Sequence, residues 1–331
     1  MTSNLYICST YYHVYITLCK VLTENQKADL MICDDIPTGK RLSEQIQKSG
    51  IFQHTWFVEE SKYPEVRGAN KLDWILFQHK RRRKEIEKLL PVSLKKYSSI
   101  FIYHDGIPLG MYLNDAHLRY HLIEDSLNFY QRFHNTAQGK YLKPHNLKFF
   151  IRKALNSGYF PLGDSNFIID IEVNENKNLQ LKGKKIKEVP RKNFEKKLTS
   201  VQKEKIQAIF ELQKISDLPE HSALLLTEPL FIDEVCNSQE EQLAIYKSIV
   251  QELKRGGLYV ILKPHPRDKT DYSELCIPQW DAYFPIELLN DFPNIRFDCA
   301  VAVSSSAIFT IKNVSHRFWW KNGKLSPVKL S

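Results

Sequence analysis

The chain has 331 residues, of which 43% are hydrophobic and 26% charged, and its formal net charge is +9. This composition is typical of a globular protein and excludes an intrinsically disordered one. The length suits two domains of ordinary size, with enough chain to bury a core. A basic protein can meet nucleic acid, a membrane surface or an anionic substrate, and the charge alone does not choose among them.

The N-terminus and the cysteines favour a cytoplasmic protein. Residues 1–8 lack the basic segment and long apolar stretch of a signal peptide. No segment approaches the ~18 uninterrupted apolar residues that a membrane span needs. The cysteines show neither a Cys-x-x-Cys pair nor zinc spacing, so we expect reduced core residues: Cys8, Cys19, Cys33, Cys236, Cys276 and Cys299. The protein is expected to be soluble or peripheral to a membrane.

Short apolar strands alternate with helices through the first part of the chain. The strands are predicted at Leu5–Cys8, Leu30–Cys33, His54–Val58, Ser99–Tyr103 and Tyr120–Ile123. Helices are predicted from the turn at Ser9–His13 to about Glu24, at Arg41–Lys48 and at Lys71–Leu90. This alternation predicts an α/β domain built on a parallel, doubly wound sheet.

The pattern is less regular from Asn135 to Lys197, although Phe167–Val173 fits a strand. We interpret this region as the passage between domains and place the domains at 1–160 and 161–331. Between Lys140 and Lys197, fourteen Lys and Arg stand against six Asp and Glu, with Phe149–Ile151 and Tyr159–Phe160 among them. Such a segment predicts attraction to an anionic membrane surface; the alternative is a basic surface that serves only solubility.

A strand–helix–strand unit opens the second half, after a helix expected at Thr199–Lys214. Its strands are Ala223–Leu226 and Leu258–Leu262, and the helix between them starts with the capping pair Ser238 and Glu241 and stops at Gly256-Gly257. A unit of this length predicts a second parallel sheet with a right-handed crossover. A short helix at Pro285–Asn290 and a strand at Cys299–Val303 follow.

The loop Lys263–Arg267, with sequence Lys-Pro-His-Pro-Arg, leaves the second strand of this unit. Ligands of parallel sheets sit outside the carboxyl ends of the strands. Pro264 and Pro266 restrict the backbone around His265 and hold it in an extended conformation. Lys263, His265 and Arg267 together favour a phosphate or another anion as the ligand. The alternative is that the prolines merely end a strand and His265 lies at the surface.

Two further strand ends carry polar groups. Ser304, Ser305 and Ser306 follow a strand, where their hydroxyls could bind phosphate oxygens or simply form a polar turn. Glu124 and Asp125 end a buried strand, where burial and like charge would raise one pKa and provide a general base. A helix N-cap at Asp125 or Ser126 is the alternative, and Asp105 in His104-Asp105-Gly106 is a rival base.

Motifs for metals and for other cofactors are not apparent. Asp170 and Glu172 come nearest to a metal-binding pair, but alternation along a strand explains them. The chain contains neither G-x-G-x-x-G nor G-x-x-x-x-G-K-[ST], so a dinucleotide site or a Walker loop is not supported. We therefore expect no cofactor and no metal site.

These features resemble the bacterial sialyltransferases of glycosyltransferase family 52, which include lipooligosaccharide and capsular sialyltransferases. The family shares an acidic-acidic-Gly motif, a His-Pro motif and a Ser motif, on a GT-B fold. Leu122–Ser126 is similar to the first, with Ser126 in place of the glycine; Lys263–Arg267 is similar to the second and Ser304–Ser306 to the third. The opening Asn4–His13 is also similar to the start of the family.

The resemblance implies two Rossmann-like domains facing a central cleft, and an inverting, metal-independent transfer of sialic acid from CMP-sialic acid. Asp125, or else Glu124, would take the proton of the acceptor hydroxyl, and His265 would meet the leaving phosphate. Lys263, Pro266, Arg267 and the three serines would bind the donor. The acceptor would lie at Tyr12, His13 and Asp105. The resemblance also implies that the acceptor is a terminal sugar, such as galactose, of a bacterial surface glycan. This glycan is often lipid-linked, and the enzyme would meet it at the inner face of the membrane. No nucleic-acid partner is implied.

Two other classes of function stay open at this point. The chain could be a GT-B transferase that uses a UDP-sugar or a CDP-linked polyol. It could also be a nucleotide- or polyanion-binding protein without catalysis, in which the basic region binds the ligand and His265 is structural. The sequence does not define the acceptor sugar, the linkage, the pathway or the oligomeric state.

Overall fold

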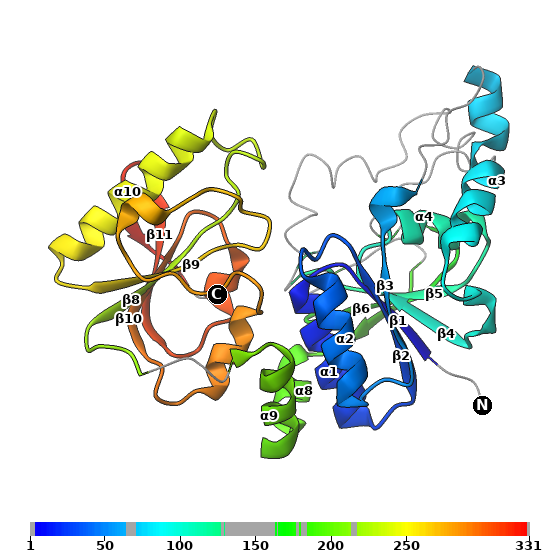
Figure 1. Cartoon of the computed structure of the whole chain (residues 1–331), viewed down its shortest axis with the longest axis horizontal. Coiled ribbons are helices and arrows are strands. Elements are labelled where there is room, and N and C mark those ends of the chain that lie inside the picture. Colours follow the sequence, from blue (N-terminus) through cyan, green and yellow to red (C-terminus); the bar gives the residue numbers. More distant parts are fainter. Residues whose placement is uncertain are drawn as a thin grey trace. The chain divides into compact units, whose positions relative to one another are not determined.

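The computed structural model describes residues 4–63, 71–126, 165–176, 184–212 and 217–329, together with positions 129, 163 and 179. The chain divides into two compact units, Met1–Ile209 and Phe210–Ser331 (Figure 1). Each unit has its own sheet, so two α/β units of Rossmann type, as expected from the alternation of strands and helices, are confirmed.

The first unit contains a seven-stranded sheet in the order β3-β2-β1-β4-β5-β6-β7. Every neighbouring pair is parallel. The strand order switches at β1, which lies between β2 and β4, and ligands of such sheets bind outside the carboxyl ends of the strands. The strands are β1 (Asn4–Cys8), β2 (Ala28–Cys33), β3 (Thr55–Val58), β4 (Ser99–Ile102), β5 (Tyr120–Ile123), β6 (Ile168–Val173) and β7 (Ile186–Glu188).

The helices of this unit form two groups. Helix α1 packs on α8 and α9, and α2 also packs on α9, whereas α3 packs on α4 (Figure 1). With helices covering the sheet, the strands are buried and contain continuous apolar runs, such as Leu5–Cys8. The helices are α1 (Tyr11–Glu24), α2 (Gly39–Ser49), α3 (Lys71–Leu89), α4 (Pro108–Asp115), α8 (Arg191–Lys197) and α9 (Ser200–Ile209).

Local chemistry fixes the start and the end of α1. The Thr10 hydroxyl accepts the backbone N–H of His13 at 3.1 Å, which is an N-cap. The helix ends at Asn25, which adopts the left-handed conformation with φ of 48° and donates its N–H to the carbonyl of Val21. The cap therefore places His13 in the first turn, directly beyond the carboxyl end of β1.

The second unit contains a five-stranded sheet in the order β12-β11-β10-β8-β9. Its strands are β8 (Ser222–Leu226), β9 (Tyr259–Lys263), β10 (Phe297–Ala302), β11 (Val314–Lys321) and β12 (Lys324–Pro327), with helix α10 at Gln239–Arg255. Strands β8 to β11 pair in parallel, and only β12 is antiparallel to its neighbour. Helix α10 is capped as predicted, because the Ser238 hydroxyl accepts the N–H of Glu241 at 3.1 Å.

The division of the chain falls at a different place from the one expected. Strands β6 and β7 extend the first sheet beyond β5, and helices α8 and α9 pack on α1, so the first unit ends at Ile209 rather than near residue 160. The helix expected at Pro285–Asn290 is a 3₁₀ helix at Ile286–Asp291. The apolar groups Phe149–Ile151 and Tyr159–Phe160, and much of the basic segment around them, lie outside the described residues.

The structure also bears on the expectations about membrane spans and about the cysteines. Within the described ranges, no helix combines the length and the apolar character needed to cross a membrane. All six cysteines are free; five are buried, and Cys276 is exposed, contrary to its expected place in the core.

Candidate active site

Three loops of the second unit meet at the carboxyl edge of its sheet. They follow β8, β9 and β10, which are adjacent and parallel, so their carboxyl ends share one edge. The loop after β9 carries His265, the loop after β10 carries Ser304–Ser306, and the loop after β8 begins at Thr227. The structure thus brings the predicted His-Pro and Ser motifs to one edge, where Thr227 joins them.

His265 is held at both its backbone and its ring. Its N–H donates to the hydroxyl of Thr227 at 3.2 Å, and its Nδ1 accepts the N–H of Arg267 at 3.1 Å. Because Nδ1 is an acceptor, a neutral ring carries its proton on Nε2. Burial, reinforced by the charges of Arg267 and Lys263, lowers the pKa of His265 to about 4. At neutral pH the ring is therefore an uncharged hydrogen-bond donor through Nε2.

A network of hydrogen bonds between side chains supports the loop that carries His265. The Thr227 hydroxyl donates to Asp268 at 2.7 Å, and Asp268 also accepts from Tyr272 at 2.7 Å and from Gln242 at 2.9 Å. Gln242 lies on α10 and is almost fully buried. The helix between β8 and β9 thereby fixes the orientation of Thr227, which in turn fixes the backbone of His265.

The two cations beside His265 are already engaged. The Lys263 ammonium donates to the carbonyls of Ala282 at 2.9 Å and Pro264 at 3.2 Å, and lies 4.4 Å from the centroid of the Phe284 ring. Burial lowers the pKa of Lys263 to about 7, against the opposing charges of Asp281 and Glu287. Arg267 is exposed and pairs with Asp233 at 3.1 Å. Lys263 thus stabilises the loop by these contacts. Pro266, which directly follows His265, is half-buried.

Glu228 organises the serine loop and was missed in the sequence. Its carboxylate accepts the N–H of Ser304 at 3.0 Å, and its own backbone N–H donates to the hydroxyl of Tyr246 on α10 at 2.7 Å. Burial raises the pKa of Glu228 to about 7, although hydrogen bonds from Ser304 and Val303 oppose the shift. Ser304 is exposed, and Ser305 and Ser306 are half-buried. The carboxyl end of predicted strand Ala223–Leu226 was the signal that could have pointed to Glu228 and Asp233.

In the first unit, His13 and Asp125 form a pair at the carboxyl edge of the sheet. The His13 Nε2 lies 2.8 Å from the carbonyl of Asp125 and 3.1 Å from its Oδ1. The His13 Nδ1 accepts the N–H of Ser9 at 3.3 Å, so the ring proton is on Nε2 and is donated to Asp125. The ring is fully buried and stacks on Tyr103 at 4.3 Å between centroids. The buried His13 ring therefore orients the partly exposed side chain of Asp125.

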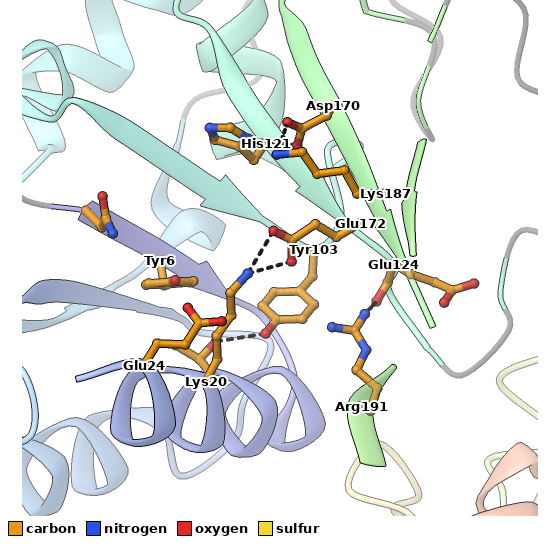
Figure 2. Close-up of polar contacts among 12 residues, drawn as sticks. Tyr6, Lys20, Glu24, Tyr103, His121, Glu124, Asp170, Glu172, Lys187 and Arg191 are labelled. Carbon is orange, nitrogen blue, oxygen red and sulfur yellow. Dashed lines mark hydrogen bonds and ion pairs between the residues drawn. The ribbon is translucent and has the colours of Figure 1, made fainter. Parts of the chain in front are cut away.

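The two acidic neighbours have different environments. Glu124 is 1% exposed, and its carboxylate accepts the N–H of Asn174 at 2.7 Å. The side chain of Asp125 is 27% exposed and is thus the carboxylate of the two that a substrate can reach. The Glu124 carbonyl accepts from the guanidinium of Arg191 at 3.1 Å (Figure 2).

The other residues expected on the acceptor side lie deeper. Asp105 has no exposed surface, and its carboxylate accepts the hydroxyl of Tyr120 at 2.9 Å and the N–H of Gly163 at 3.4 Å. These contacts belong to the interior of the unit, where the Asp105 carboxylate is bonded to groups of the protein itself. Tyr12 is half-buried at the start of α1.

Asp170 and Glu172 are paired with cations of the protein rather than with each other (Figure 2). Glu172 accepts from Lys20 at 2.8 Å and 2.5 Å, and Asp170 accepts from His121 and Lys187. Burial would raise the pKa of Asp170, but the hydrogen bonds from Lys187 and His121 hold it below its usual value. In the part of the chain that the structure describes, no three His, Cys, Asp or Glu side chains gather in a way that could hold a metal ion.

The arrangement in the second unit suits a group with oxygen acceptors and negative charge. A neutral Nε2–H donor, three serine hydroxyls and the exposed guanidinium of Arg267 lie on loops at one sheet edge, where a phosphate would meet several donors.

Comparison with known families defines the class further. The sequence model described as glycosyltransferase family 52 matches residues 52–318, which is most of the chain. The chain belongs to glycosyltransferase family 52. The family predicted from the three motifs is thereby confirmed.

Individual relatives are more distant. An uncharacterized protein of Haemophilus influenzae is 30% identical over 115 residues, which cover 33% of this chain and 36% of that protein, so the matched part spans about a third of the relative. The structure is similar to the glycotransferase of kitacinnamycin (TM-score 0.46, 9% identity, 93% of this chain and 77% of that chain). It is also similar to the calicheamicin glycosyltransferase CalG4 (TM-score 0.42, 10% identity, 93% and 77%). These structural likenesses are too weak to bear on the substrate.

Proposed function

We propose that the chain is an inverting, metal-independent sialyltransferase that moves sialic acid from CMP-sialic acid to a terminal sugar, such as galactose, of a bacterial surface glycan. The observation that carries the proposal is the carboxyl edge of the second sheet, where His265 offers an uncharged Nε2–H and the loop of Ser304–Ser306 leaves the same edge. CMP is a monophosphate leaving group, and these donors match a single phosphate. Membership of a glycosyltransferase family supports the reaction class.

In the proposed step the acceptor oxygen forms a bond to the anomeric carbon as the bond from that carbon to the phosphate oxygen breaks. CMP leaves with the bonding electron pair, and His265 with the serine hydroxyls stabilises the charge that develops on its phosphate. Asp125 takes the proton of the acceptor hydroxyl, oriented for this by the Nε2–H of His13. The proposal assigns the acceptor hydroxyl to Asp125 in the first unit and the leaving phosphate to His265 in the second unit.

Some of the expected site residues receive narrower roles in this proposal. Lys263 supports the His265 loop from within, because its ammonium is bonded to two carbonyls. Glu124 and Asp105 support the first sheet from the interior, and His13 positions Asp125 instead of binding the acceptor. Arg267, Pro266 and the serines remain the proposed donor contacts, and Tyr12 the proposed acceptor contact.

The proposal places the enzyme in the cytoplasm, at the inner face of the membrane where a lipid-linked glycan would be met. The basic composition between Lys140 and Lys197 supports it, since each Lys or Arg near an anionic surface adds attraction. Capsule and lipooligosaccharide pathways both fit this placement.

Incubation of the purified chain with CMP-sialic acid alone tests the donor. We expect slow release of CMP, faster release when a galactose-terminated acceptor is added, and thermal stabilisation by CMP above that by CDP, UMP or UDP. Turnover of a UDP-sugar or a CDP-polyol instead would identify a different transferase. Binding of nucleotides or polyanions with no turnover of any donor would identify a binding protein.

Activity is expected to survive chelation. A monophosphate leaving group carries less charge than a diphosphate, and the donors around His265 can stabilise it without a cation. Transfer should therefore proceed equally well with EDTA and with added magnesium. Loss of activity in EDTA that magnesium or manganese restores would contradict the metal-independent mechanism and favour a diphosphate donor.

A further inference from the structure

Arg191 is the first residue of α8 and lies directly after β7, at the same sheet edge as Asp125. Three consecutive strand ends hold it. Its backbone N–H donates to the side chain of Asn174, which follows β6, at 3.0 Å. Its Nη2 donates to the carbonyl of Glu124, which follows β5, at 3.1 Å, and Figure 2 shows the guanidinium reaching toward that carbonyl. The side chain is thus preorganised by the fold.

Most of the donors of this guanidinium are unused. Arg191 is 3% exposed, and both Nε and Nη1 are buried without a hydrogen-bond partner among the described residues. Among the residues that the structure describes, no carboxylate forms an ion pair with it. Other cations of this unit differ: Lys20 pairs with Glu172 at 2.5 Å and Arg82 with Asp115 at 2.6 Å. Arg191 is therefore a buried positive charge bonded to a single neutral carbonyl.

Such an arrangement costs free energy, because a buried charge without a counter-charge loses its hydration and regains little. The cost disappears if an anion completes the site. A guanidinium is planar, keeps its charge at all working pH values, and matches the oxygens of a carboxylate or a phosphate. Glu124, whose carbonyl holds Arg191, immediately precedes Asp125, so an anion bound here would lie within one residue of the proposed base.

We propose that Arg191 binds a carboxylate or phosphate group of the acceptor, so that the acceptor is an acidic glycan. This inference rests on the proposed function, because it takes Asp125 as the residue that meets the acceptor. The donor meets His265 in the second unit, and Arg191 meets an oxyanion carried by the sugar that receives the transferred residue.

Calorimetric titration of the full chain with three sugars, without nucleotide, tests this site. The sugars are lactose, 3′-sialyllactose, which adds a carboxylate, and lactose 6′-phosphate, which adds a phosphate. We expect one of the charged sugars to bind about 10- to 100-fold more tightly than lactose, as ionic hydrogen bonds contribute in other proteins. The preferred charged sugar identifies the source of the anion. Equal affinity for all three sugars would overturn the proposal.

The variants Arg191→Gln and Arg191→Lys assign the preference to this residue, with Arg255→Gln as a control. Arg255 is exposed and pairs with Glu252 on α10 of the second unit, so its substitution makes the same change of charge outside the unit that holds Arg191. Arg191→Gln should lose the preference, Arg191→Lys should keep part of it, and Arg255→Gln should keep all of it. Retention of the preference in a folded Arg191→Gln protein would assign Arg191 a structural role only.

Kinetics separates the acceptor from the donor. In Arg191→Gln the KM for the acidic acceptor should rise about 10- to 100-fold, while the KM for the donor and the affinity for CMP should stay within about twofold. A selective rise in the KM for the donor would overturn the assignment to the acceptor. The titrations need no turnover, so failure to use CMP-sialic acid would reject the proposed function and still leave the anion site decided by the binding data.

Discussion

His265→Ala should fold and lose about 10²- to 10³-fold in turnover, the range seen when one preorganised donor to a developing negative charge is removed. The ring offers Nε2–H because Nδ1 accepts the N–H of Arg267. The backbone contact with the Thr227 hydroxyl does not depend on the ring and should persist in the variant. Steady-state rates of CMP release at saturating donor, with the thermal unfolding midpoint of each protein, would measure the effect.

Two further variants make this result specific. His316→Ala removes an exposed histidine from β11 and should leave turnover unchanged. His265→Gln keeps an N–H donor and should recover part of the rate. Because burial lowers the pKa of His265 to about 4, we also expect no inflection in the pH profile of kcat/KM from this residue between about pH 6 and 8. Wild-type turnover in a folded His265→Ala protein would remove His265 from the mechanism.

The position of His265 was predictable because local signals agreed. An apolar run of strand length ends at Leu262, and Pro264 and Pro266 stiffen the chain on either side of His265. The structure confirms the strand and the edge position. The contacts that set the chemistry were not local. Thr227, which holds the backbone of His265, is 38 residues away, and Asp268 depends on Gln242 of α10.

The same distinction explains the domain boundary. The strand Phe167–Val173 was recognised from its apolar residues, and β6 occupies Ile168–Val173. Which sheet a strand joins depends on pairing with a distant partner, here β5, where Ile171 lies opposite Leu122. Sequence periodicity contains no information about that partner, so the crowded charges before residue 197 were interpreted as the passage between domains.

The hairpin β11–β12 was missed although its turn carried a signal. Asn322 and Gly323 have φ values of 50° and 73°, which is the pattern of a tight two-residue hairpin turn, and Asn-Gly is the pair that favours it. The strand residues around the turn contain Trp319 and Trp320, which suit a sheet. The pairing of His13 with Asp125 had no comparable signal, since 112 residues separate the two.

Asp125→Asn should lower turnover by about 10²- to 10⁴-fold, the contribution typical of a positioned general base, while CMP binds within a few fold of wild type. The amide cannot take a proton from the acceptor hydroxyl. It still presents an oxygen to the Nε2–H of His13, which is also bonded to the backbone carbonyl of residue 125, so the local structure should persist. Single-turnover rates and calorimetric titration with CMP would separate the two effects.

Asp233→Asn is the competing variant, because Asp233 is an exposed carboxylate on the loop after β8 and pairs with Arg267 at 3.1 Å. A carboxylate that shares its charge with a guanidinium is a weaker base, so we expect Asp233→Asn to change donor binding more than the chemical step. Asp298→Asn, near the start of β10, serves as the control and should leave both turnover and donor binding unchanged. If Asp233→Asn were inactive and Asp125→Asn active, the base would belong to the same unit as His265, and the first unit would contribute only to acceptor binding.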